Sequence, residues 1–122
     1  MRWTKSFLEI DETIITLLTN PGGFCDVAED RIHRERNILK SYIREYPDFR
    51  TTHTAWIHVA EHEIIQKMIA STEIFHIGPM AAVAGAISET VLEAVIEAGA
   101  KEVVVDNGGD IALYIHDPVY IG

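Results

Sequence analysis

The feature that most constrains the fold is a pair of apolar runs separated by a polar turn near the end of the sequence. Residues 102–106 and 111–116 are the two runs, and Asn107-Gly108-Gly109-Asp110 lies between them. Asn-Gly between apolar runs is the strongest short-range signal for a β-hairpin. Paired glycines also leave backbone amides uncovered, so the same turn can hold an anion through its amides or a hard cation through its carboxylates. The local pattern leaves both interpretations open, a plain hairpin and a ligand-binding turn.

The other strands and the helices follow from hydrophobic periodicity. A second hairpin is expected over residues 3–10 and 13–19, with Asp11-Glu12 at its turn. Between the two strand pairs the apolar spacing becomes helical. The pattern predicts helices over residues 26–46, 60–71 and 79–98, and a short extended segment over residues 54–58.

Turn and capping residues set the limits of these helices. Asp26 is the expected N-cap of the first helix, because Glu29 follows three residues later in a capping-box pattern. Pro47 ends that helix. Gly78-Pro79 begins the third helix, since proline is favoured at the first helical position, and Gly99 ends it.

A strand pair, then helices, then a second strand pair is the order of an α+β protein. Strands joined by short turns are antiparallel, and the helices between the pairs then collect on one face of the sheet. We therefore expect a four-stranded antiparallel sheet rather than a doubly wound α/β fold. A length of 122 residues supports one core, so residues 1–122 are interpreted as a single domain.

Composition restricts the partners and the location of the protein. The net charge of −9 argues against a nucleic-acid or anionic-membrane surface, because both require a basic patch. No run approaches the ~20 apolar residues of a membrane span, and no apolar segment of the signal-peptide type follows the first five residues. A single cysteine, Cys25, fits a reducing compartment. We expect a cytoplasmic protein with neither a nucleic-acid nor a membrane partner.

Residues 78–86, Gly-Pro-Met-Ala-Ala-Val-Ala-Gly-Ala, have little side-chain bulk for the start of a helix. They offer no Ser, Thr, Asp or Asn as an N-cap, so the N–H groups of the first turn lack an obvious side-chain partner. These donors could hold a phosphate or carboxylate, which the helix dipole favours by ~0.3–1 kcal/mol. The alternative is that small residues only let the helix pack tightly on the sheet.

Together the two glycine motifs resemble the ApbE-like superfamily, and within it a branch found in archaea and bacteria that has no assigned reaction. The motifs are residues 78–86 and 105–111, and residues 42–49 and 64–70 agree with the same branch. The resemblance covers nearly the whole chain. It implies a T-fold-like architecture of two strands, two main helices and two strands, and it implies that the chain corresponds to one half of a longer architecture.

The resemblance also implies a function. Better-known relatives are FAD:protein FMN transferases, which use magnesium and FAD to attach FMN to a threonine of a target protein. In these relatives the magnesium-binding Asp and Thr side chains belong to a second half beyond this chain, so flavin transfer by this chain alone is not expected. A role in archaeal sulfur assimilation into homocysteine is an alternative implication. For a flavin nucleotide or another small anionic ligand, with Asp110 as the metal ligand, the expected site residues are Gly78, Pro79, Met80, Ala81, Asn107, Gly108, Gly109 and Asp110.

A rival motif is His58-Val59-Ala60-Glu61-His62, which fits the H-x-x-E-H pattern of zinc peptidases. That pattern requires both imidazoles on one helix face and a third, distant ligand. The alternative is two solvated histidines near a helix start. Cys25, near a helix N-terminus, is expected to be a small packing or surface residue, and His76 is the histidine closest in sequence to Gly78.

An open four-stranded sheet leaves two edge strands that must be covered, charged or paired. The last strand, Ile111–Ile115, is apolar enough to pair with another chain. We therefore expect a homo-oligomer, and a non-enzymatic assembly unit is the alternative function.

Overall fold

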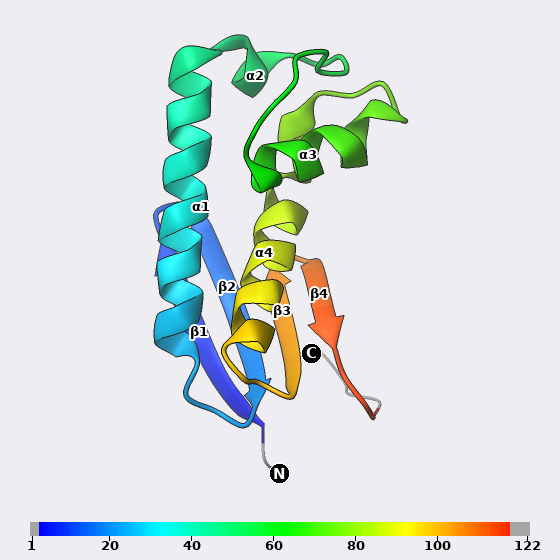
Figure 1. The fold of residues 1–122 in the computed structure, drawn as a ribbon. Coiled ribbons are helices and arrows are strands. Elements are labelled where there is room, and N and C mark those ends of the chain that lie inside the picture. The colour runs from blue at the N-terminus through cyan, green and yellow to red at the C-terminus, as the bar shows by residue number, and fades with distance from the viewer. Residues whose placement is uncertain (1–2, 118–122) are drawn as a thin grey trace.

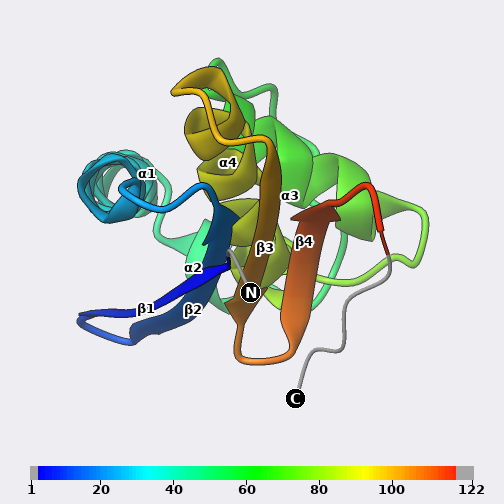
Figure 2. The ribbon, with the colours of Figure 1, turned by 90° about the horizontal axis from the view of Figure 1, so that it is seen from below.

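The computed structural model describes residues 3–117 and shows an α+β fold, as expected (Figure 1). Four strands form one antiparallel sheet in the order β1-β2-β3-β4. The long helices lie together on one face of this sheet (Figure 2). In chain order the elements are β1 (Thr4–Ile10), β2 (Thr13–Asn20), α1 (Cys25–Glu45), α2 (Asp48–Thr51), α3 (Glu63–Glu73), the 3₁₀ helix η1 (Pro79–Ala82), α4 (Val83–Glu97), β3 (Glu102–Asn107) and β4 (Asp110–Tyr114).

Both hairpins close with two-residue turns at the same end of the sheet. In the first, Ile10 pairs with Thr13, and Asp11 takes a left-handed φ of 51°. In the second, Asn107 pairs with Asp110, and the φ values of Gly108 and Gly109 are 62° and 99°. Two successive positive φ values define the type I′ turn, whose twist matches that of the strands. The hairpin prediction is confirmed for both strand pairs.

The core lies between the inner face of the sheet and the helices. Strand residues at alternate positions point inward, as a half-covered sheet requires. Their partners are the apolar stripes of α1 and α4, where residues at three-and-four spacing are buried. The largest fully buried side chains include Ile15, Leu17, Ile32, Ile64, Ile65, Met68, Val91, Val95, Val103 and Val105.

Helix α4 begins differently from the expectation. The chain from Pro79 first forms the 3₁₀ helix η1 and becomes α-helical only at Val83. Gly99, with φ of 118°, follows the end of α4 as predicted, because this backbone conformation is accessible mainly to glycine. The segment Pro79–Glu97 is long and apolar enough to cross a membrane by length and composition alone. Its apolar stripe is nevertheless accounted for by burial against the sheet, for example at Ile87 and Val91.

Three local expectations were wrong. Helix α1 starts at Cys25 with Phe24 as its N-cap residue, so Asp26 lies within the first turn, where its charge faces the helix dipole instead of capping a single N–H. The segment 54–58 is irregular, because neither edge strand of the sheet lies beside it to supply a ladder. Helix α3 begins at Glu63 rather than at residue 60, because Ala60 is held in the preceding loop by a 2.8 Å hydrogen bond from Gln66.

Gly78 has a steric role that a substitution can test. A Cβ at this position would overlap the carbonyl oxygen of Thr52, whereas its φ of −67° is open to any residue. Gly78→Ala should therefore lower the free energy of unfolding by about 2 kcal/mol through the clash alone. The matched control is Gly85→Ala in α4, whose Cβ would meet the nearest side-chain atom at 3.5 Å and which should gain up to about 1 kcal/mol of helix propensity. Urea unfolding of both variants measures the difference, and equal stabilities would refute the packing at Gly78.

Candidate functional site

The turn between β3 and β4 lies directly beside the first turns of α4. The Asn107 side chain donates a hydrogen bond to the carbonyl oxygen of Ala84 at 3.2 Å. The Ser88 hydroxyl donates to the backbone carbonyl of Asp110 at 2.9 Å. A Cβ on Gly85 would lie 3.5 Å from an Asp110 carboxylate oxygen, an ordinary van der Waals distance, so this carboxylate lies directly beside the start of α4. The structure thus brings the second part of the small-residue segment against the glycine turn.

The first part of that segment lies elsewhere in the fold. Gly78 and Pro79 are buried, and Gly78 packs against the backbone of Thr52. Met80 is half-buried and packs against the core, while Ala81 is exposed. In the glycine turn itself, the Gly109 N–H donates a 2.9 Å hydrogen bond to the Asp106 carboxylate, so this amide is already used within the turn.

A groove lies on the helix side of the molecule where α4 begins, and we call it the α4-start groove. It has a volume of about 500 Å³. Sites for small-molecule ligands commonly fall in the range of ~300–1,000 Å³. Its lining combines three basic side chains with one acidic and four apolar ones: Arg36, Lys40, Arg50, Glu12, Leu39, Ile43, Met80 and Val83.

The basic side chains of this groove differ in how they are held. Arg36 donates hydrogen bonds to Thr13 and Glu12, each at 2.7 Å, and its side chain is 14% exposed. The hydrogen bond from Arg36 lowers the pKa of the Glu12 carboxyl. The Nε atom of Arg36 is buried without a hydrogen-bond partner among the described residues. Lys40 lies 3.5 Å from Asp11, and Arg50, which is exposed, forms no ion pair within residues 3–117.

Sequence reasoning missed this groove. Arg36 and Lys40 are one helical turn apart on α1, and this i,i+4 spacing was the available signal. Acidic residues intersperse the basic ones along the chain, so no basic run stands out. Arg50 reaches the groove from α2, a four-residue helix that periodicity did not predict.

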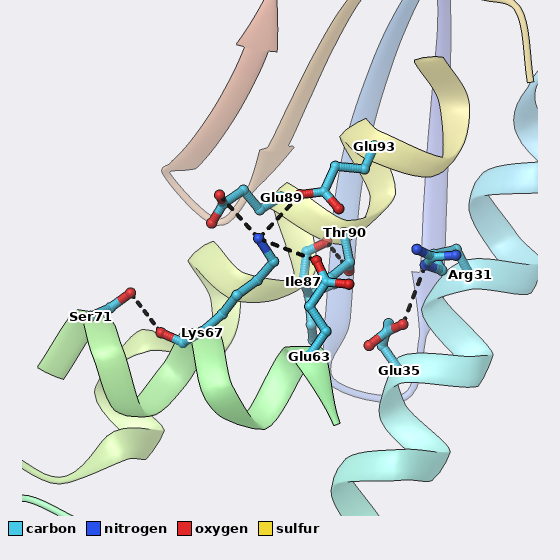
Figure 3. Close-up of polar contacts among 9 residues, drawn as sticks. All are labelled: Arg31, Glu35, Glu63, Lys67, Ser71, Ile87, Glu89, Thr90 and Glu93. Carbon is cyan, nitrogen blue, oxygen red and sulfur yellow. Dashed lines mark hydrogen bonds and ion pairs between the residues drawn. The ribbon is translucent and has the colours of Figure 1, made fainter. Parts of the chain in front are cut away.

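A second group of charged side chains joins α3 to α4 (Figure 3). Lys67 of α3 lies 3.1 Å from Glu93 and 3.3 Å from Glu89 of α4, and 3.6 Å from Glu63 on its own helix. Burial lowers the pKa of Lys67, but the hydrogen bonds to Glu93 and Glu89 outweigh it and raise the pKa overall. These contacts tie α3 to α4 and offer no cavity or nucleophile for chemistry.

Glu35 on the neighbouring helix is the most buried carboxylate of the described chain, at 4% exposure. Its nearest cation is Arg31, one turn earlier, with Nε to Oε1 at 3.2 Å. That Arg31 nitrogen lacks a well-aligned hydrogen bond. Burial therefore raises the pKa of Glu35, against the opposing effects of Arg31 and Arg34.

The zinc-peptidase arrangement is absent from the structure. His62 is the N-cap residue of α3 and His58 lies in the preceding loop, so the two do not share a helix. His58 stacks on Tyr46 with ring centroids 5.7 Å apart. Between residues 3 and 117, no three or more His, Cys, Asp or Glu side chains are grouped as metal ligands. Asp110 would thus be a single protein ligand in this part of the chain.

Cys25 and His76 are the remaining single candidates. Cys25 is a half-exposed free thiol at the start of α1 and packs against the core. His76 is exposed and has a left-handed φ of 56° in the loop after α3. It is two residues from Gly78, which is buried, so the two do not form a common surface.

The fold and the groove define an α+β domain with a small, partly basic groove at a helix start. Comparison with protein families then identifies the group to which it belongs. Residues 7–122 match the family described as AbpE bacteria, and the chain belongs to that family.

Similar proteins come from archaea and share the name UPF0280 protein. The chain is 35% identical to the one from Methanothrix thermoacetophila over 120 residues, which are 97% of this chain and 51% of that protein. It is 41% identical to the one from Archaeoglobus fulgidus over 111 residues, 91% of this chain and 47% of that protein. For Methanocella arvoryzae the identity is 41% over 123 residues, 100% of this chain and 49% of that protein. The chain therefore spans about half the length of the curated relatives it matches.

The buried carboxylate gives a pH-dependent prediction. The raised pKa means that the fold binds a proton at Glu35 more tightly than the unfolded chain does. The free energy of unfolding should therefore fall as pH rises from the ordinary carboxyl pKa of 4.5 through the raised value. Glu35→Gln should remove this fall and be at least as stable as the wild type near pH 7, since it retains an acceptor for Arg31.

Urea unfolding at intervals between about pH 4 and pH 7 measures this effect. Glu29→Gln is the matched control, because Glu29 is an exposed glutamate on the same helix and carries the same charge. If the free energy of unfolding of Glu35→Gln depends on pH as that of the wild type does, titration of the buried Glu35 is not the cause of this dependence.

Proposed function

We propose that this chain forms part of a small-molecule-binding protein related to the ApbE-like superfamily. Its ligand is a flavin nucleotide or another small anionic ligand, held in the α4-start groove. The single observation that carries the proposal is the gathering of Arg36, Lys40 and Arg50 around the start of α4 in a protein of net charge −9.

The electrostatics of the groove favour an anion. Three basic side chains and one acidic side chain line it, so the local sign is opposite to that of the whole protein. No side chain caps η1 or α4, and the positive end of the helix dipole adds to the basic side chains.

The apolar lining favours a ligand that also has a ring or chain to bury. Leu39, Ile43, Met80 and Val83 supply this part of the groove. Apolar walls with a few convergent polar groups are the usual composition of a site for a cofactor-sized molecule. A flavin nucleotide, with an aromatic ring system and a phosphate, has both kinds of surface.

The glycine turn supplies the second part of the proposed site. Asp110 is exposed and lies beside Gly85 in the first turns of α4, so its carboxylate is available to a divalent cation such as magnesium. One carboxylate is too few protein ligands for a closed site, and ligand oxygens commonly complete a magnesium shell. Transfer of FMN to a protein would require further groups. We propose this transfer only for an assembly that also contains the half of the longer relatives that this chain does not match.

Calorimetric titration with FMN and FAD, with and without magnesium, tests the proposal directly. We expect binding that weakens about tenfold in Arg50→Gln, because a charged hydrogen bond contributes about 1.5–3 kcal/mol. Arg44→Gln is the matched control, since Arg44 is an exposed arginine near the end of α1 that does not line the groove. Asp110→Asn should abolish any strengthening by magnesium while leaving metal-free binding unchanged.

Two results would count against this function. If the folded protein binds neither FMN nor FAD, a flavin nucleotide is not its ligand. Binding that is equally strong in Arg50→Gln and in the wild type would place the ligand outside the α4-start groove.

A further inference from the structure

The turn between β1 and β2 holds two carboxylates against the basic side chains of the α4-start groove. This turn lies beside the middle of α1 (Figure 1). The Nη2 atom of Arg36 is 2.7 Å from Oε2 of Glu12 and 3.5 Å from Oδ2 of Asp11. The same Asp11 oxygen is 3.5 Å from Nζ of Lys40. Two of the three cations that line the groove are therefore already paired with carboxylates of this turn.

The positive charge that a ligand would meet in the groove is smaller than the number of basic side chains indicates. Arg36 and Lys40 face the carboxylates of the turn, and only Arg50 forms no ion pair within residues 3–117. An anion that enters the groove can bind Arg50 alone, or it can take over the contacts that the turn makes with Arg36. The second mode uses more of the basic side chains and requires that a carboxylate leave.

Glu12 is the partner that can leave. Its side chain is 87% exposed, whereas that of Arg36 is 14% exposed. Arg36 also donates a 2.7 Å hydrogen bond through Nη1 to the Thr13 hydroxyl, which holds the guanidinium in place without Glu12. Arg36 is the one ion-pair partner of the Glu12 carboxylate among the described residues. An ion pair with such an exposed member is weak, so a second anion can replace it.

We propose that the β1–β2 turn supplies an internal counter-anion to the α4-start groove, and that an anionic ligand displaces Glu12 from Arg36 when it binds. The inference rests on the proposed function, because it concerns the same groove and the same class of ligand. In the free protein the Glu12 carboxylate takes the contact that a phosphate or carboxylate of the ligand would make. Binding then exchanges one anion for another, so the turn discriminates against anions that bind Arg36 more weakly than Glu12 does.

The charge state of Glu12 agrees with this role. The hydrogen bond from Arg36 lowers the pKa of the Glu12 carboxyl below its ordinary value of 4.5. Glu12 is therefore negatively charged near pH 7 and competes there with the ligand. If Glu12 instead helped to hold the ligand, for example by accepting a hydrogen bond from it, removal of its charge would weaken binding. The two roles thus predict opposite changes in affinity.

Calorimetric titration of the wild type and Glu12→Gln with FMN and with inorganic pyrophosphate tests the proposal near pH 7. Glu12→Gln should bind at least one of these anions about fivefold more tightly, because it removes both the competitor for Arg36 and a repulsive charge. Asp11→Asn should strengthen binding about twofold, since it releases Lys40 from a longer contact. Asparagine also tolerates the left-handed φ of 51° at this position, so the turn should be retained.

Glu9→Gln is the matched control. Glu9 is an exposed glutamate on β1 of the same hairpin, opposite Ile14, and it does not line the groove. Its substitution removes the same charge from the protein without releasing Arg36. It should change neither affinity appreciably, because exposed charges that are not in contact are largely screened by salt.

The two anions separate this inference from the proposed function. If Glu12→Gln binds pyrophosphate more tightly than the wild type does and neither protein binds FMN, the counter-anion is supported and the flavin is removed as ligand. If Glu12→Gln binds neither anion more tightly than the wild type does, the inference is overturned, whether or not the wild type binds FMN. Equal strengthening by Glu9→Gln also overturns it, because the effect would then come from net charge alone.

Discussion

The packing of α4 on the inner face of the sheet is the constraint on which the rest of the structure depends. The helix buries Ile87, Val91 and Val95 against strand residues such as Val103 and Val105. Two side-chain hydrogen bonds also fix its first turns to the β3–β4 hairpin. The Asn107 amide donates to the carbonyl of Ala84, and the Ser88 hydroxyl donates to the carbonyl of Asp110. Helix start, glycine turn and α4-start groove therefore have fixed relative positions, because each contacts the same helix.

Most of the fold could be predicted from the sequence, because its long elements have unambiguous periods. The four strands, the positions of α1 and α4, and the turn at Gly108 follow from alternation, from three-and-four spacing and from residues that tolerate positive φ. The segment between α1 and α3 has no such period. It is held by contacts with distant side chains, for example the 2.9 Å hydrogen bond from the Trp56 indole to Tyr42. Local propensity contains no information about these contacts, which explains the wrong strand at residues 54–58 and the missing helix α2.

The candidate site divides in the same way. The two sequence motifs predicted that Gly78–Ala81 and the glycine turn lie together, whereas the structure brings Ala84, Gly85 and Ser88 against the turn. The sequence did not predict that the basic side chains of the groove lie together. Arg36, Lys40 and Arg50 become neighbours of Met80 only after α1 and α2 pack beside the start of α4. Gly78 illustrates the opposite error. The backbone of Thr52 leaves no room for a side chain at this position. Gly78, which the sequence predicted to line a ligand site, therefore has a packing role.

The sheet separates the proposed ligand site from the exposed apolar side chains of its other face. The α4-start groove is built from helix residues and the β1–β2 turn on the covered face, whereas Phe7, Ile14 and Leu113 point to the other face. Strand alternation enforces this separation, because successive side chains of one strand cannot serve the same surface. Leu17 is thus part of the core beneath the helices, while Leu18, the next residue, points to the other face. The residues that line the α4-start groove come from the helices and from the β1–β2 turn, so a ligand in the groove and the side chains of the outer face do not compete for the same surface.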